Sequence, residues 1–198
     1  MSELHPGFAP HKAQRRLLRS RKRFIAAAAG VRGGKSYGSA AKFIRRIAED
    51  FKLSTGTFVS VGPLRARIIA AGAPCVQDAV ITGIDRDDVG MLVFPRLDEC
   101  RKLAGLGDDV GADEVLRNPA VRAHFQSLVD RMWREGTGSA SRVARAHVMA
   151  VPPSIDRDEV TDKGSINQRA VLQHRDALVA AMYEGRESDP FLILPRRG

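Results

Sequence analysis

The first quarter of the chain contains a short apolar run, a glycine-rich turn and an amphipathic segment, in that order. Residues 24–29 read FIAAAA, which has the length and apolarity of a buried strand. Residues 30–34 are rich in Gly, and residues 35–48 place apolar side chains close to every 3.6 positions, as a helix does. We therefore expect a strand–turn–helix unit, preceded by a short basic helix over residues 11–22 and by loosely attached residues 1–10.

From residue 57 onward, short apolar runs alternate with segments of helical periodicity. The predicted strands cover residues 57–61, 75–84, 90–94 and 143–151. The predicted helices cover residues 62–72, 97–104, 111–117, 119–135 and 166–183. One face of the helix over 119–135 is apolar and consists of Val121, Phe125, Leu128, Val129 and Met132. This alternation predicts an α/β (α+β) fold, a small domain with a short sheet flanked by helices.

Charge divides the chain more sharply than hydropathy does. The formal net charge is +9; residues 1–50 hold 12 Lys and Arg against 3 Asp and Glu, and the remaining residues hold 20 of each kind. Such an excess predicts an anionic partner for the N-terminal part, such as a nucleotide or nucleic acid. A solvated basic helix without a partner would have the same composition.

Composition also restricts the cellular setting that we expect. The two cysteines, Cys75 and Cys100, lack the spacing of a metal or redox motif, which is typical of reduced residues in an intracellular protein. The N-terminus lacks the apolar core of a signal peptide, and no apolar run approaches the roughly 20 residues that cross a bilayer. We therefore expect a soluble, cytoplasmic protein with no membrane partner.

Residues 29–36 read AGVRGGKS, which matches the [AG]-x-x-x-x-G-K-[ST] pattern of a Walker A phosphate loop. Glycines let backbone N–H groups turn toward a phosphate, and the following helix N-terminus adds the positive end of its dipole. Lys35 would reach the β- and γ-phosphates of ATP, and Ser36 would be the Mg²⁺ ligand if the loop is functional. The other nucleotide-binding residues that the motif implies are Gly30, Gly33 and Gly34. A glycine-rich turn that only caps a helix is the alternative interpretation.

Two residues beside the motif extend the pattern: Gln14 lies upstream of the loop and Arg32 lies inside it. With them, residues 5–47 resemble the start of a phage terminase large subunit, the ATPase that packages DNA, in which such a Gln contacts adenine. A Walker B strand must end in an acidic residue, and the nearest candidates end at Asp85 and Glu99, both interrupted by unsuitable residues. We therefore expect neither ATP turnover nor DNA packaging by this chain.

A second pattern begins where the first one ends. Its spacing is roughly G-R-x-x-(D/E)-x-x-K-(L/V)-x-x-G, and it is matched by Arg46, Glu49, Lys52 and Gly56, with Arg45 in place of the first Gly. On this hinge motif, and on the segment TGSASRVARAHVMAVPPSIDRDEVTDKGSINQRAVLQHR, residues 46–198 resemble the C-terminal lid domain of adenylate-forming enzymes. The resemblance is closest to feruloyl-CoA synthetases, which activate hydroxycinnamates with ATP and then CoA.

The resemblance implies a reaction in two halves. A carboxylate attacks the α-phosphate of ATP to give an acyl-adenylate; the lid then rotates about its hinge, and CoA displaces AMP. Ala48 corresponds to the hinge position, beside Arg46. Gly56 lies in the loop that approaches the CoA pantetheine, where a glycine permits close approach, although an ordinary turn uses glycine equally well.

The adenylation half-reaction needs a cation near the carboxylate and the α-phosphate. Most of the superfamily has a lysine directly after the glycine of a T-x-x-G-K segment, but here residues 161–165 read TDKGS, with Ser165 in that place. The feruloyl branch shares the TDKG arrangement, which implies Lys163 as the catalytic lysine. Arg169 is a second candidate, and a solvated loop lysine is the alternative interpretation.

These observations divide the chain into a basic, terminase-like leader over residues 1–45 and a ligase lid over residues 46–198. The large part of the ligase that holds the acyl pocket is missing, so we expect no ligase activity from the chain alone and a separate adenylation core as a partner. The family ligands are ATP, Mg²⁺ and CoA. Three interpretations stay open: a fusion, a degenerate nucleotide-binding module, and a truncated frame that folds only as a lid. The alternative function is that of an ATP-binding fragment of a phage terminase large subunit, and DNA is a partner only under this terminase interpretation.

Overall fold

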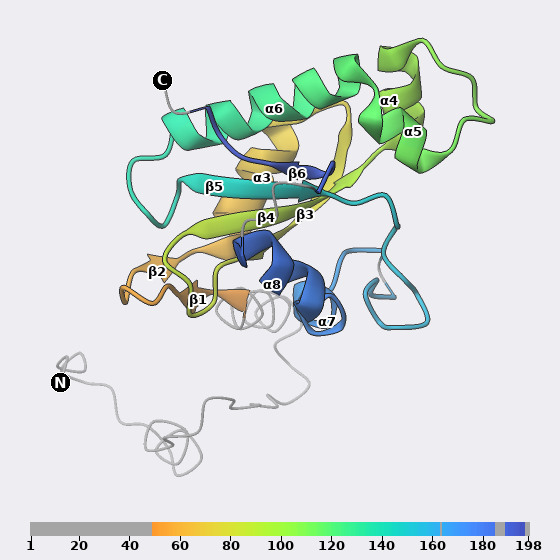
Figure 1. The fold of residues 1–198 in the computed structure, drawn as a ribbon. Helices are drawn as coiled ribbons and strands as arrows, with labels where there is room; N and C mark the ends of the chain where they lie inside the picture. The colour runs from red at the N-terminus through yellow and green to blue at the C-terminus, as the bar shows by residue number, and fades with distance from the viewer. Residues whose placement is uncertain (1–48, 163, 185–188, 197–198) are drawn as a thin grey trace, which may run out of the picture. The chain divides into compact units, whose positions relative to one another are not determined.

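The computed structural model describes residues 49–162, 164–184 and 189–196, which all lie within one compact unit of the chain (Figure 1). The strands are β1 (Phe51–Lys52), β2 (Phe58–Val59), β3 (Val76–Thr82), β4 (Val89–Pro95), β5 (Val143–Val148) and β6 (Leu192–Ile193). The helices are α3 (Val61–Ala71), α4 (Leu97–Ala104), α5 (Ala112–Arg117), α6 (Pro119–Arg134), α7 (Gln168–His174) and α8 (Asp176–Glu184). The expected small α+β domain with a short sheet and flanking helices is confirmed.

The central sheet is mixed, with the strand order β3-β4-β5-β6. β3 and β4 form an antiparallel hairpin, β5 runs parallel to β4, and β6 is antiparallel to β5. The parallel pair needs a long connection, because a tight turn cannot join two parallel strands. Helices α4, α5 and α6 provide it. A separate small hairpin pairs β1 with β2.

Helices cover both faces of this sheet, and the strand residues alternate between the two sides (Figure 1). Met91 and Val93 of β4 lie in the larger core with α3 and α6, while Leu92 and Phe94 lie in the smaller core with α7 and α8. All four side chains are at most 1% exposed. Burial on both faces explains why the strand residues read as a continuous apolar run rather than as an alternating pattern.

The apolar face predicted for the helix over 119–135 is confirmed in α6. All five of its residues are at most 3% exposed: Val121, Phe125, Leu128, Val129 and Met132. The Asn118 side chain caps the helix by accepting a hydrogen bond from the Ala120 N–H, and Pro119 occupies the first turn. α6 therefore packs one apolar stripe against the sheet.

Other predicted elements differ from the structure in length or continuity. The strand expected over 143–151 ends at Val148, and the strand expected over 57–61 is the two-residue β2. The single helix expected over 166–183 is wrong, because it is divided into α7 and α8 at Arg175. Arg175 has φ −114° and ψ 26°, which is not helical backbone. Its side chain donates hydrogen bonds to Glu159 and to the Val151 and Pro152 carbonyls, all at least 16 positions earlier in the chain.

Both cysteines are free and buried, as predicted for reduced residues. Burial is the main cause of a raised pKa at Cys75, and it raises the pKa of the Cys100 thiol to about 12. Neither side chain is more than 1% exposed. Their environment is that of small apolar core residues rather than of reactive thiols.

Candidate functional site

Most of the residues predicted to carry chemistry lie outside the described residues. These are Gln14, Gly30, Arg32, Gly33, Gly34, Lys35, Ser36, Arg46, Ala48 and Lys163. The described part contains the residues on both sides of Lys163, the hinge-loop Gly56 and the second cation candidate Arg169. The site is therefore built from the segment that carries the TDKG sequence.

A tight hairpin brackets position 163. Val160 and Ile166 form an antiparallel bridge, and the Thr161 N–H donates to the Ser165 carbonyl at 2.8 Å. The Gly164 N–H donates back to the Thr161 carbonyl at 2.7 Å, and Gly164 has φ 74°. A three-residue connection that ends in a left-handed glycine is a common hairpin geometry, because glycine adopts positive φ without a Cβ clash. The Gly of TDKG thus closes the loop that contains Lys163.

The hydroxyl groups at the two ends of this loop also contact each other. Thr161 Oγ1 and Ser165 Oγ lie 2.8 Å apart, within hydrogen-bond distance. Ser165, which the resemblance places where most of the superfamily has its lysine, therefore contributes to closing the hairpin. Both side chains lie near the surface of the domain.

A buried ion pair fastens the base of the hairpin to the domain. Glu159 is 1% exposed, and the Arg175 guanidinium donates to both of its carboxylate oxygens, at 2.9 and 2.7 Å. The same guanidinium donates to the Val151 and Pro152 carbonyls and lies 5.2 Å from the centre of the Phe94 ring. Two parallel N–H···O bonds fix the orientation of both groups. The segment before the hairpin is thus tied to the junction of α7 and α8 and to β4.

The electrostatics of this pair favour the charged carboxylate. The hydrogen bond from Arg175 is the main cause of a lowered pKa at Glu159, and the Ser154 N–H, which donates to Oε2 at 2.7 Å, acts in the same direction. Burial opposes both effects. Sequence reasoning missed the pair because its two residues are 16 positions apart and neither belongs to a recognised motif.

The start of α7 is fixed by two polar side chains that follow the hairpin. Asn167 caps the helix by accepting a hydrogen bond from the Ala170 N–H. The buried Gln168 side chain accepts a hydrogen bond from the Ile81 N–H at 3.1 Å, which satisfies a donor on the edge strand β3. Arg169 lies in this first turn and is exposed.

Gly56 lies on a different element from the TDKG hairpin. It is in the turn between β1 and β2, has φ 81°, and would have open space around an added Cβ. Its N–H donates to the Leu53 carbonyl at 2.9 Å. The positive φ explains why a glycine occupies this turn. Gly56 and Arg169 therefore lie on different elements, the β1–β2 turn and α7.

The two acidic residues considered for a Walker B strand do not end strands. β3 ends at Thr82, and Asp85 follows in the turn with φ 57°. Glu99 is in α4, where its carboxylate pairs with the Lys102 ammonium at 2.8 Å. Among the described residues, no three His, Cys, Asp or Glu side chains are grouped so that they could hold a metal ion.

The histidines of the described part have structural surroundings. His147 is 6% exposed, and its Nε2 lies 3.0 Å from an Asp189 carboxylate oxygen, which joins β5 to the segment before β6. Burial lowers the pKa of His147, and Asp189 opposes that effect. His124 contacts the Gly72 carbonyl through Nε2 at 3.2 Å. Both histidines thus hold neighbouring segments of the fold together.

No helix in the described ranges is long and apolar enough to span a bilayer.

No curated protein matches the chain. Among solved structures, the A domain of carboxylic acid reductase from Segniliparus rugosus, in complex with AMP and a co-purified carboxylic acid, matches with a TM-score of 0.52 and 22% identity. The match covers 70% of this chain and 20% of that one. An A-PCP didomain of carboxylic acid reductase from Segniliparus rugosus, in complex with AMP, matches with a TM-score of 0.49 and 23% identity, over 69% of this chain and 17% of that one.

The first of these matches shows a shared fold over most of the described domain, while the chain spans about a fifth of that reductase structure. A family model gives the more specific assignment. The model of the AMP-binding enzyme C-terminal domain matches residues 50–187, which covers β1 to β5, helices α3 to α8 and the TDKG hairpin. The chain therefore belongs to the AMP-binding enzyme C-terminal domain family, the lid domains of adenylate-forming enzymes.

Proposed function

We propose that this chain is the lid of an acyl- or aryl-CoA ligase of the feruloyl-CoA synthetase type, and that it acts together with a separate adenylation core. The observation that carries the proposal is the TDKG hairpin, which is closed by Gly164 and fastened to the sheet through Glu159 and Arg175. A catalytic cation has to be held in a narrow range of positions, because small displacements cost much of the rate. A short hairpin with an anchored base meets that requirement.

In this proposal, Lys163 supplies the cation of the adenylation half-reaction. When a carboxylate attacks the α-phosphate of ATP, negative charge develops on the phosphoryl oxygens while pyrophosphate leaves. A positioned ammonium group stabilises that charge in a site from which water is excluded. Arg46 and Ala48 would form the hinge, and Gly56 would approach the CoA pantetheine after rotation.

The chain alone is expected to form no thioester. A lid supplies one wall of the active site, and the acyl pocket and most of the ATP site belong to the adenylation core. The measurement is incubation of the purified chain with ferulate, ATP, Mg²⁺ and CoA, followed by chromatographic detection of feruloyl-CoA. Thioester formation by the pure protein would contradict the proposal that a separate core is needed.

We propose that the leader, residues 1–45, binds ATP through its Walker A sequence but does not hydrolyse it. The comparisons give the terminase alternative no support, since the family match begins at residue 50. Replacing Lys35 with Ala is expected to abolish ATP·Mg²⁺ binding by the full chain, because that ammonium would contact the β- and γ-phosphates. Calorimetry with Lys163→Ala as the matched control measures this directly. Equal binding by the wild type and by Lys35→Ala would contradict a working phosphate loop.

A further inference from the structure

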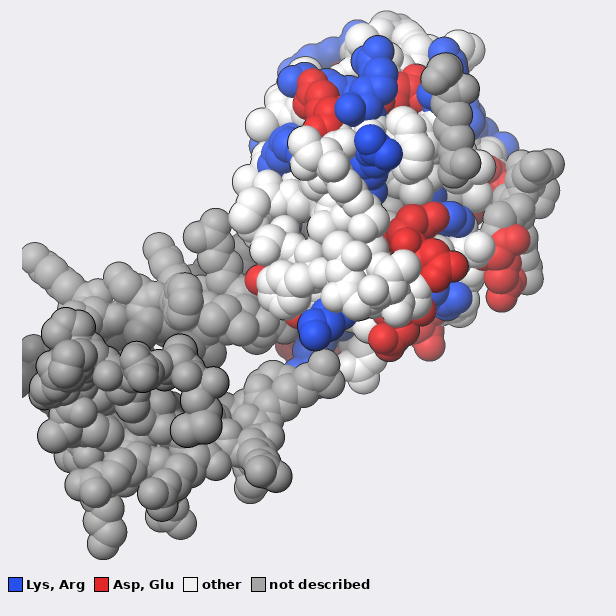
Figure 2. Space-filling view, turned by 90° about the vertical axis from the view of Figure 1, so that its left-hand side faces the viewer, with Lys and Arg blue, Asp and Glu red and all other residues white. Residues whose placement is uncertain are grey.

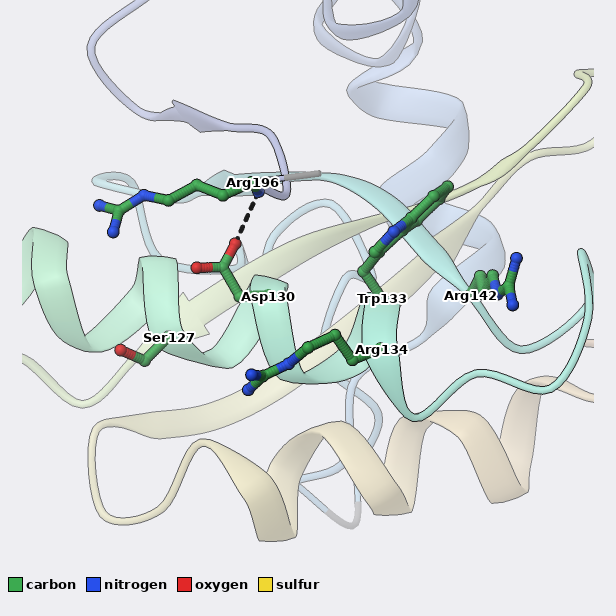
Figure 3. A pocket seen from close by; sticks show the side chains of 6 residues that line it. All are labelled: Ser127, Asp130, Trp133, Arg134, Arg142 and Arg196. Carbon is green, nitrogen blue, oxygen red and sulfur yellow. Dashed lines mark hydrogen bonds between the residues drawn. The ribbon is translucent and has the colours of Figure 1, made fainter. Parts of the chain in front are cut away.

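Arginine side chains line two adjoining grooves on the outer side of α6. The larger groove, of about 580 Å³, is lined by Ser127, Asp130, Trp133, Arg134, Arg142 and Arg196 (Figure 3). The second groove shares Arg196 with the first and adds Arg117 and Arg122. Residues 122 and 134 are twelve positions apart on one helix, so the two grooves extend over about 18 Å. We call these five arginines, together with Trp133, the arginine strip.

Three of the five guanidinium groups of the strip are oriented by uncharged partners. Arg142 donates to the Gly136 carbonyl at 2.9 Å and lies 5.7 Å from the Trp133 ring centre. Arg117 lies 5.3 Å from the Phe191 ring centre, and Arg122 donates to the Pro190 carbonyl. Carbonyls and aromatic rings hold a guanidinium in place without cancelling its charge.

Elsewhere in the domain, some half-buried arginines are neutralised by carboxylates, while Arg67 and Arg101 donate to the Ser141 and Val110 carbonyls. Arg65, Arg145 and Arg175 each pair with a carboxylate at 2.5–2.8 Å. Within the described ranges, no arginine of the strip forms an ion pair of this kind. Residues 51–198 hold 20 basic and 20 acidic residues, so a net positive charge of this part of the chain does not explain the strip. In Figure 2, many blue side chains lie at the upper end of the domain with red ones among them, and further red ones lie lower down.

Asp130 is the acidic residue in the groove, and one of its oxygens is already engaged. Its Oδ1 accepts hydrogen bonds from the Gln126 side chain at 2.9 Å and from the Arg196 backbone N–H at 2.8 Å. Figure 3 shows the carboxylate beneath Arg196, whose own side chain extends away along the helix. Asp130 therefore fixes the C-terminal segment on α6 and does not pair with a guanidinium of the strip.

Apolar surface lies beside the charges. Leu194 is 48% exposed, and its carbonyl accepts a hydrogen bond from the Gln126 side chain at 2.8 Å, which places it between the two grooves. Trp133 is half-buried at the other end. Trp and Arg are the residues that most often dominate the energy of protein–protein contacts. A phosphodiester backbone has no apolar counterpart for Leu194, whereas an amphipathic polypeptide has one.

We propose that the arginine strip is a docking surface for an acidic, amphipathic segment of a partner protein. The carboxylates of the segment would meet the arginines, and its apolar side chains would cover Leu194 and Trp133. The leader of this chain is not the occupant, because residues 1–50 carry a net charge of +9 and would be repelled.

The test is binding of the full chain to a fluorescein-labelled peptide of alternating Glu and Leu blocks. A length of about twelve residues spans about 18 Å as a helix. We expect Arg134→Glu/Arg196→Glu to weaken binding by roughly tenfold or more, since two attractive contacts become repulsive. The matched control, Arg96→Glu/Arg157→Glu, makes the same charge change at exposed arginines outside the strip and is expected to bind like the wild type.

Two outcomes would overturn the proposal. Equal losses in the strip variant and in the control variant would mean that the peptide responds to net charge, including that of the leader, rather than to the strip. Tighter binding of a single-stranded oligothymidylate than of the peptide, lost in the strip variant alone, would assign the strip to nucleic acid instead. Circular dichroism of both variants checks that the domain is folded, which is expected because all four replaced arginines are exposed.

Discussion

Replacing Arg175 with Met is expected to destabilise the domain by about 3–5 kcal/mol at neutral pH, the usual cost of removing one partner of a buried ion pair. The Arg175 side chain is 12% exposed and that of Glu159 is 1% exposed, so solvent cannot compensate the carboxylate that is left behind. The Val151 and Pro152 carbonyls lose their donor as well. Urea unfolding followed by circular dichroism measures the change, with Arg157→Met as the control at an exposed position.

The pH dependence gives this prediction a second check. The folded-state pKa of Glu159 is lowered below its ordinary value, chiefly by the Arg175 hydrogen bond. A group of this kind adds stability above its unfolded pKa, and that contribution disappears as the pH falls through the folded pKa. The stability difference between wild type and Arg175→Met should therefore be largest near neutral pH and shrink below about pH 4. If Arg175→Met lowered the free energy of unfolding at neutral pH no more than Arg157→Met does, the role given to the ion pair would be contradicted.

Replacing Lys163 with Ala is expected to slow acyl-adenylate formation by roughly 10²–10³-fold, the usual effect of removing one group that stabilises transition-state charge. The assay mixes the chain with a feruloyl-CoA synthetase core from which the lid has been deleted, and it measures ferulate-dependent exchange of pyrophosphate into ATP. Lys163→Arg keeps the charge and should retain part of the rate.

Arg169→Ala is the matched control for this second prediction. Arg169 lies in the first turn of α7, directly after the hairpin, and is the other candidate cation. A larger loss in Arg169→Ala than in Lys163→Ala would assign the role to Arg169. Wild-type exchange in both variants would mean that neither residue takes part in adenylation.

Local patterns predicted the long elements of this fold well. α3, α4, α5 and α6 lie within one residue of their expected bounds, and the apolar face of α6 is the one that its spacing indicated. β3 and β4 were also found, because each is a run of buried apolar residues. Hydrophobic patterns identify these segments because each helix buries one face against a core and each of the two strands is buried on both faces.

The features that sequence patterns missed depend on contacts between distant residues. β1 and β6 have two residues each, too few for a pattern. The break between α7 and α8 occurs at Arg175, whose side chain is held by Glu159 and by the Val151 and Pro152 carbonyls. The arginine strip joins residues of α5, α6 and the C-terminal segment, which no local window contains.

The TDKG hairpin was predicted in part from the sequence. The spacing of Thr161 and Gly164 pointed to the segment through its resemblance to a ligase motif, and a glycine at the third loop position is a known hairpin signal. What the sequence left out was the anchor, since Glu159 reads as an ordinary acidic residue of a charged loop. Its burial becomes visible only when Arg175 is placed beside it.

The central claim, that this chain is a lid which completes a separate adenylation core, is tested most directly by complementation. The measurement is feruloyl-CoA formation from ferulate, ATP, Mg²⁺ and CoA by the chain, by the lid-deleted core, and by an equimolar mixture of the two. The account predicts no product from either protein alone and measurable turnover from the mixture, lost when the chain carries Lys163→Ala. No gain in the mixture over the core alone, at concentrations where the two proteins are shown to bind, would contradict it.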